Sequence, residues 1–88
     1  MIKVVTTVHK HNDSRNDKDT KRHSTWRIHT CVVDFGNQES QLMFSPAGVY
    51  PSAEAAHAAS RAEALEKIRA RGHTEPEDEI IWRLHVIP

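Results

Sequence analysis

Alternating hydrophobic and polar residues mark four expected strands along the chain. β-branched residues dominate the first, residues 2–9, where Ile2, Val4 and Val8 fall on one face at a period of two. The remaining strands are expected at residues 25–35, 40–44 and 80–87, and Gly36 with Asn37 favours a hairpin turn between the second and the third.

The same alternation assigns side chains to the two faces of the sheet. Four residues of the second strand are expected beneath a covering element: Trp26, Ile28, Thr30 and Val32. Arg27, His29, Cys31 and Val33 are expected on the opposite face, although the pattern breaks near Val32, which indicates a bulge or burial on both faces. In the last strand Ile80, Trp82, Leu84 and Val86 point one way, and Ile81, Arg83, His85 and Ile87 the other.

An alanine-rich segment, residues 53–71, predicts the covering element as a helix. Ser52 is placed to cap its N-terminus, and Gly72 supplies the stop at its C-terminus. Residues at helical spacing are expected to form its buried stripe: Ala55, Ala58, Ala62, Leu65 and Ile68.

These elements predict an α+β fold in the order β-β-β-α-β. A mainly antiparallel sheet of about four strands would carry one helix packed on one face, because a single helix can cover only one face of a sheet. A length of 88 residues fits a single small domain spanning 1–88. Residues 10–24 contain no apolar residue and are expected to form a long mobile loop.

The overall charge gives no electrostatic argument for a nucleic-acid or membrane partner. Twelve basic residues balance twelve acidic ones, although residues 1–30 carry seven of the basic residues against three aspartates. Cys31 is the one cysteine of the chain, which excludes an intramolecular disulfide and a thiolate zinc cage. No apolar run has the length of a membrane span or a signal peptide, so we expect a cytoplasmic protein without a membrane partner.

The uncovered sheet face is expected to be basic and rich in imidazole groups. If Trp26 and Trp82 lie under the helix, alternation places Arg27, His29, Arg83 and His85 on the other side. If Ile2, Val4 and Val8 also face the helix, Lys3, Thr7 and His9 join them. Such a face could bind an anion or a nucleic acid, or it could be the ordinary polar side of a half-buried sheet.

Some residues have the type and spacing found in metal sites or catalytic sites, but the sequence lacks the other groups that such sites require. His9 and His11 lie on one strand face and could bind one metal ion together. The aspartates that follow them do not have the spacing of a calcium-binding loop, and we predict no metal site. Cys31 near His29 suggests a nucleophile and a base, yet no orienting group or oxyanion donor can be identified. Motifs for phosphate binding or hydrolysis are also absent from the sequence, and we predict neither an enzyme nor a cofactor.

The leading functional hypothesis is therefore a small non-enzymatic interaction or regulatory module. It would bind a protein partner or a second copy of itself, as a homodimer, through the uncovered sheet face or an edge strand. Apolar residues on that face, such as Met43 and Ile81, favour a protein partner, and a bare terminal strand at 80–87 would invite pairing. The alternative is nucleic-acid or anion binding through the Arg/His face.

Overall fold

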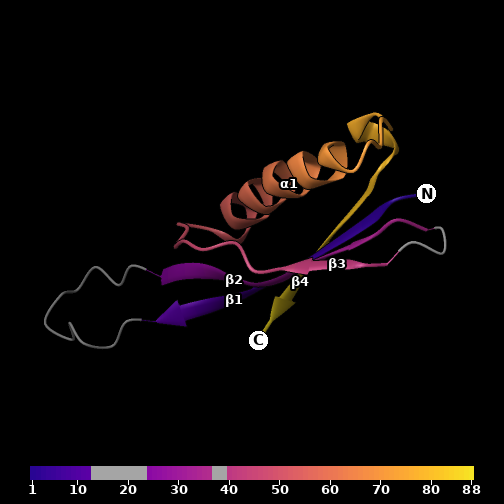
Figure 1. The fold of residues 1–88 in the computed structure, drawn as a ribbon. Coiled ribbons are helices and arrows are strands. Elements are labelled where there is room, and N and C mark those ends of the chain that lie inside the picture. Colours follow the sequence, from indigo (N-terminus) through magenta and orange to yellow (C-terminus); the bar gives the residue numbers. More distant parts are fainter. Residues whose placement is uncertain (13–23, 37–39) are drawn as a thin grey trace, which may run out of the picture.

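One helix packs on one face of a four-strand mixed sheet (Figure 1). The computed structural model describes residues 1–12, 24–36 and 40–88. In chain order the elements are β1 (Lys3–Asn12), β2 (Ser24–Asp34), β3 (Leu42–Phe44), α1 (Ala53–Ala70), the 3₁₀ turn η2 (Glu77–Glu79) and β4 (Ile81–Ile87). The predicted α+β order β-β-β-α-β is confirmed.

The strands are arranged in the order β3-β2-β1-β4. β2 is antiparallel to both β1 and β3, whereas β4 lies parallel to β1 on its other side. The parallel pair requires the chain to cross over the sheet between β3 and β4, and α1 makes this crossover (Figure 1). The sheet is thus mainly antiparallel, with β3 and β4 at its two edges.

The first two strands extend further than the hydrophobic pattern predicts. Pairing between Lys10 and Trp26, and between Asn12 and Ser24, carries the ladder into the polar segment. The ladder therefore includes residues 10–12 and 24 of the expected loop. The remainder of the expected loop, residues 13–23, lies outside the described residues, as do residues 37–39 of the expected hairpin turn.

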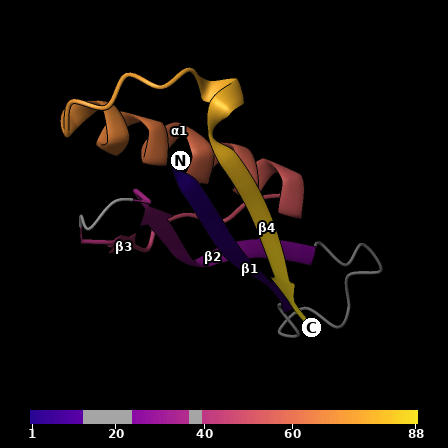
Figure 2. The same ribbon diagram turned by 90° about the vertical axis from the view of Figure 1, so that its right-hand side faces the viewer.

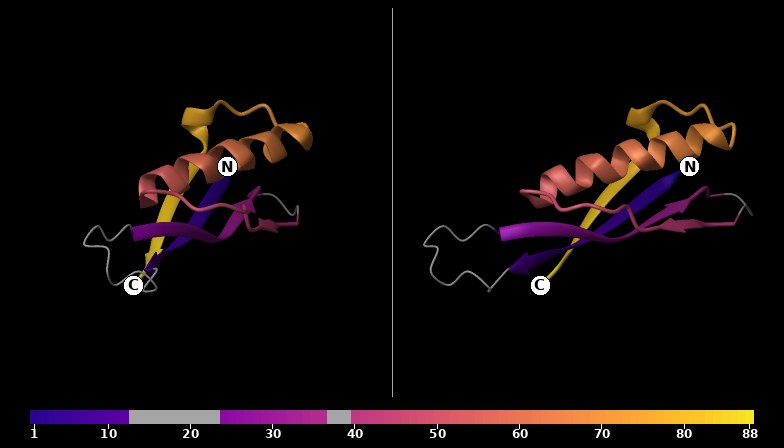
Figure 3. Two further views of the ribbon diagram at one scale, coloured as in Figure 1. Left: turned by 90° about the vertical axis from the view of Figure 1, so that its left-hand side faces the viewer. Right: turned by 60° about the vertical axis from the view of Figure 1, so that its left-hand side comes forward.

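The ends of α1 follow the predicted signals. The Ser52 hydroxyl accepts a 3.0 Å hydrogen bond from the backbone N–H of Ala55, which satisfies one of the unpaired donors at the helix N-terminus. Gly72 follows the helix with a φ of 90°, a conformation that favours glycine. The helix lies along one side of the twisted sheet (Figure 3).

The predicted buried stripe of α1 is wrong, apart from Ile68. The buried helix residues are Ala53, Ala56, Ser60, Ala64 and Ile68. Ala58 and Ala62, which were expected to face the sheet, are exposed, and Ala55 and Leu65 are only half-buried. Because alanine occurs all round this helix, hydrophobicity cannot distinguish its faces, and a serine lies at the centre of the buried stripe.

A β-bulge at His29 changes the facing of β2. Thr7 pairs with Thr30 but Val8 pairs with Ile28, so His29 is the extra residue with no partner across the ladder. Beyond the bulge the alternation is reversed relative to the prediction. Cys31 and Val33, expected on the outside, are fully buried, while Thr30 and Val32 take the outward positions opposite Thr7 and Val5.

Two hydrophobic clusters hold α1 against the sheet. The larger contains buried residues of β1, β2 and α1 and of the segments next to the strands: Ile2, Val4, Cys31, Val33, Phe35, Ala64, Ile68 and Ile80. The smaller contains Val8, Ile28, Ala53 and Ala56, with Trp26 and Tyr50 packed on it. The helix therefore sits mainly over β1 and β2.

A polar contact joins the helix to β1 between these clusters. Thr6 and Ser60 are both completely buried, and their hydroxyl oxygens lie 2.8 Å apart in a hydrogen bond. The Thr6 hydroxyl also lies 3.8 Å from the sulfur of Cys31, to which it can donate. Because buried hydroxyls must be paired, this contact fixes the position of the helix along the strands.

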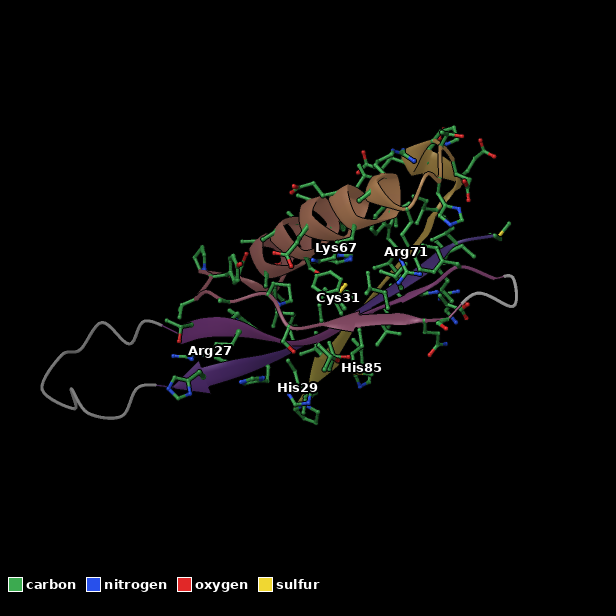
Figure 4. The ribbon with its side chains drawn as sticks, in the orientation of Figure 1. Arg27, His29, Cys31, Lys67, Arg71 and His85 are labelled. Carbon is green, nitrogen blue, oxygen red and sulfur yellow. The ribbon has the colours of Figure 1, made fainter. Side chains whose placement is uncertain are left out.

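Three cationic side chains, two on α1 and one at its C-cap, lie over aromatic rings at the margin of the core. Figure 4 labels Lys67 and Arg71. The distances from the charged group to the ring centroid are 4.7 Å for Arg61 over Trp82, 5.0 Å for Lys67 over Phe44 and 4.8 Å for Arg71 over Phe35. These basic side chains thus close the rim of the core. In the described part of the chain, no helix is long and apolar enough to cross a membrane.

The revised helix stripe can be tested with two leucine substitutions. Ser60→Leu should lower the free energy of unfolding by at least about 2 kcal/mol, because it overfills the contact and leaves Thr6 without its hydroxyl partner. Ala62→Leu, on the exposed side, should change it by less than about 0.5 kcal/mol. Urea unfolding followed by circular dichroism measures both values, and the reverse order of effects would support the stripe expected from the sequence.

Candidate interaction surface

All six residues predicted to line the uncovered face do lie there. We call the sheet side opposite α1 the outer face. Its members alternate with the residues of each strand that face the helix side: Lys3 and His9 on β1, Arg27 and His29 on β2, and Arg83 and His85 on β4. Five are exposed and His9 is half-buried. In Figure 4, His29 and His85 project from the sheet away from the helix.

These basic side chains form a strip along the sheet and do not converge on one point. Lys3 and His9 are six residues apart on β1, which corresponds to about 20 Å along a strand. Apolar side chains lie between them on the same face: Val5, Val32, Met43, Ile81 and Ile87. The outer face is consequently a mixed surface, in which apolar and basic residues alternate.

The closest imidazole pair on the outer face is His9 and His29. Their ring centroids are 6.1 Å apart in an edge-to-face arrangement. No group of three or more His, Cys, Asp or Glu side chains in the described residues is placed to hold a metal ion. His11 lies at the paired end of β1, opposite Thr25, while Asp13, Asp17, Asp19 and His23 are outside the described residues.

The suggested pairing of Cys31 with His29 is wrong. The bulge sends the two side chains to opposite faces, so that Cys31 lies between the sheet and the helix (Figure 4). Burial raises the pKa of the Cys31 thiol, against the opposing effect of hydrogen bonds with Ser60 and Thr6. A buried, protonated thiol is a core residue and not a nucleophile.

His57 on α1 has a lowered pKa. Its ring is half-buried, and its Nε2 atom is buried without a hydrogen-bond partner among the described residues. Desolvation, and secondarily the charge of Arg61, lowers the pKa of His57. Protonation of this residue therefore opposes folding.

β4 is the most exposed strand of the sheet, and the sequence did not predict this. Trp82, Leu84 and Val86 pair with Val4, Thr6 and Val8, so their side chains are on the helix side as expected. Leu84 and Val86 nevertheless remain 36% and 43% exposed, because α1 lies over β1 and β2. Figure 2 shows the second half of β4 running beyond the helix.

One side of β4 also carries backbone groups that have no strand partner in the described part of the chain. Within the described part of the chain, β1 is its single neighbour in the sheet. The N–H of Ile81 donates a 2.9 Å hydrogen bond to the carbonyl of Ile2, so Ile81 and every second residue after it turn their backbone groups toward β1. The backbone groups of Trp82, Leu84 and Val86 therefore point to the opposite side, which we call the free edge.

The start of β4 is anchored to the rest of the protein. The Trp82 indole N–H donates a 3.0 Å hydrogen bond to the carbonyl of Glu77, while Arg61 stacks on its ring and contacts the Glu77 carboxylate at 3.3 Å. These contacts hold one end of β4 in place. The free edge is thus presented on a fixed strand and not on a loose tail.

Comparison with known proteins finds no family model that matches this sequence, and no curated protein or solved structure with significant similarity to it.

The lowered pKa of His57 predicts how stability depends on pH. In the unfolded chain the ring takes up a proton at its ordinary pKa, so the free energy of unfolding should fall as the pH drops from about 7.5 to about 5. His57→Leu should make the free energy of unfolding depend less on pH, because leucine does not bind a proton in either the folded or the unfolded chain. Urea unfolding of both proteins at the two pH values measures the difference. Parallel curves for both would contradict the assignment.

Proposed function

We propose that this protein is a non-enzymatic interaction module that binds a polypeptide, from a partner protein or from a second copy, by adding a strand to the free edge of β4. The proposal rests on one observation, that β4 exposes both backbone groups and apolar side chains. Its backbone groups at Trp82, Leu84 and Val86 have no strand partner among the described residues, and the Leu84 and Val86 side chains beside them are exposed.

The composition of β4 supports this role. Proteins usually protect an edge strand by making it short or by placing lysine or proline in it. β3, at the other edge, has only three residues, whereas β4 has seven and contains neither lysine nor proline. Added strands bind through main-chain hydrogen bonds, and the side chains on alternate positions give specificity.

The candidate catalytic chemistry offers no competing explanation. The burial of Cys31 and its separation from His29 leave that pair without a shared site. His29 and His85 project from the side of the sheet opposite α1, so the helix does not enclose them in a pocket (Figure 4). An interaction role uses these features without requiring a pocket.

Val86→Pro tests the binding strand directly. The N–H of Val86 faces the free edge, so proline should preserve the hydrogen bonds to β1 while blocking an added strand. The wild-type protein should select peptides with alternating apolar residues from a displayed library of short random sequences. Val86→Pro should fail to enrich them, because it lacks a donor and its ring obstructs the edge.

Met43→Lys is the matched control for this selection. Met43 is 67% exposed on β3, far from the free edge, so this variant should enrich the same peptides as the wild type. Enrichment of those peptides by Val86→Pro would show that β4 is not the binding strand. If the wild-type protein selects no peptides, the result would contradict the proposal that β4 binds a strand from another protein.

Nucleic-acid binding is the second candidate, favoured by the exposure of Lys3, Arg27 and Arg83 on the same outer face. Binding to phosphates would be strongest at low salt and would weaken as salt is added. The mixed surface makes this the weaker candidate, since nucleic-acid platforms add aromatic residues for base stacking and the two tryptophans are on the helix side.

A low-salt shift assay with DNA and RNA separates the two candidates. If the outer face binds nucleic acid, Arg27→Glu and Arg83→Glu should each weaken binding by at least about tenfold. Arg69→Glu, an equal charge change on the exposed side of α1, should have a smaller effect. We expect no binding by the wild-type protein at any salt concentration, and a complex that is sensitive to Arg27 and Arg83 would establish the second candidate instead.

A further inference from the structure

We propose that the polypeptide received by the free edge is β4 of a second copy, which joins the two sheets into one continuous sheet about a two-fold axis at Leu84. This inference rests on the proposed role of β4 and adds the identity of the partner. It follows from the register of the backbone groups, the kind of side chains they bring together, and the position of the helix.

The backbone groups at the free edge define the register. They belong to Trp82, Leu84 and Val86, with Leu84 in the middle. In an antiparallel pair about an axis at Leu84, Leu84 faces Leu84 of the second copy, and Trp82 faces Val86 of the second copy. Each of these residues can then both donate to and accept from its opposite number. This register also overlaps the full length of the strand.

Neighbouring registers are less favourable. An axis at Arg83 would place two arginines directly opposite each other, which is destabilising for like charges. An axis at His85 would set Trp82 opposite Pro88, which has no N–H to donate. The axis at Leu84 avoids both problems, since Arg83 then faces His85 of the second copy.

The side chains match in kind across the axis. Antiparallel pairing by two-fold symmetry keeps residues of the same face together, so the exposed Leu84 and Val86 of each copy meet apolar side chains. Ile81 faces Ile87 of the second copy on the outer face, and both are partly exposed in the single chain. A strand whose sequence is complementary to its own reverse is a specific argument for a second copy over an unrelated partner.

The position of α1 leaves room for this arrangement. Both helices would lie on the same side of the joined sheet, because the axis is perpendicular to it. Each helix sits over β1 and β2, and β4 extends beyond it (Figure 2). The side chains of Trp82, Leu84 and Val86 from both copies would then fill the space between the two helices.

Sedimentation equilibrium over a range of protein concentrations tests the proposal. From roughly 1 μM to 1 mM, where modest interfaces dissociate, the average mass of the wild-type protein should rise from one chain toward two. Leu84→Lys should raise the dissociation constant at least about tenfold, because it places two lysines face to face at the axis. Met43→Lys, an apolar-to-lysine change at a more exposed position, should leave the constant unchanged.

The outcomes separate this inference from the proposed function. A wild-type protein that stays monomeric throughout the range overturns pairing with a second copy, whereas the peptide selection with Val86→Pro still decides whether β4 binds other chains. A dimer weakened by Met43→Lys and not by Leu84→Lys also overturns it, and would place the interface on the outer face.

Discussion

The contact between α1 and β1 at Ser60 and Thr6 governs the layout of this protein. One helix of eighteen residues cannot cover four strands, so its position determines which parts of the sheet are buried. The buried hydroxyl pair, with a hydrophobic cluster on each side, holds the helix over β1 and β2. The small residues beside Ser60 on the buried stripe allow this close approach, and β4 is left exposed beyond the helix.

The bulge at His29 completes this arrangement. Without it, a strict alternation along β2 could not place both Ile28 and Cys31 beneath the helix. The extra residue lets β2 contribute Ile28 to one cluster and Cys31 to the other, while His29 keeps the outward direction that the alternation before the bulge gives it. The irregularity thus serves the core by reversing the facing of the residues that follow it.

The order of elements could be predicted from sequence because strands and helix carry distinct periods and clear end signals, such as Ser52 and Gly72. The six basic residues of the outer face were also placed correctly, since the alternation in β1, β4 and the first part of β2 is regular. Two predictions were wrong. The helix stripe was misplaced because alanine surrounds the helix, and the facing of Cys31 was inverted by a bulge of one residue.

The exposure of β4 could not be predicted from the sequence either, for a different reason. Alternation correctly assigned Leu84 and Val86 to the helix side, but a local pattern does not say which strands a helix covers. That depends on strand order, which is set by contacts between residues far apart in the chain, such as Thr6 and Ser60. The apolar character of residues 80–87 was visible, and only the topology shows that they form an edge.

Amide hydrogen exchange along β4, resolved by residue and measured in dilute and concentrated protein, tests the central claim most directly. In dilute protein the amides of Arg83 and His85 should exchange slowly because they bond to β1, while those of Leu84 and Val86 exchange fast. In concentrated protein Leu84 and Val86 should become protected as well. Equal protection of all four amides in dilute protein, or no concentration dependence at Leu84 and Val86, would contradict a free edge that pairs with a second copy.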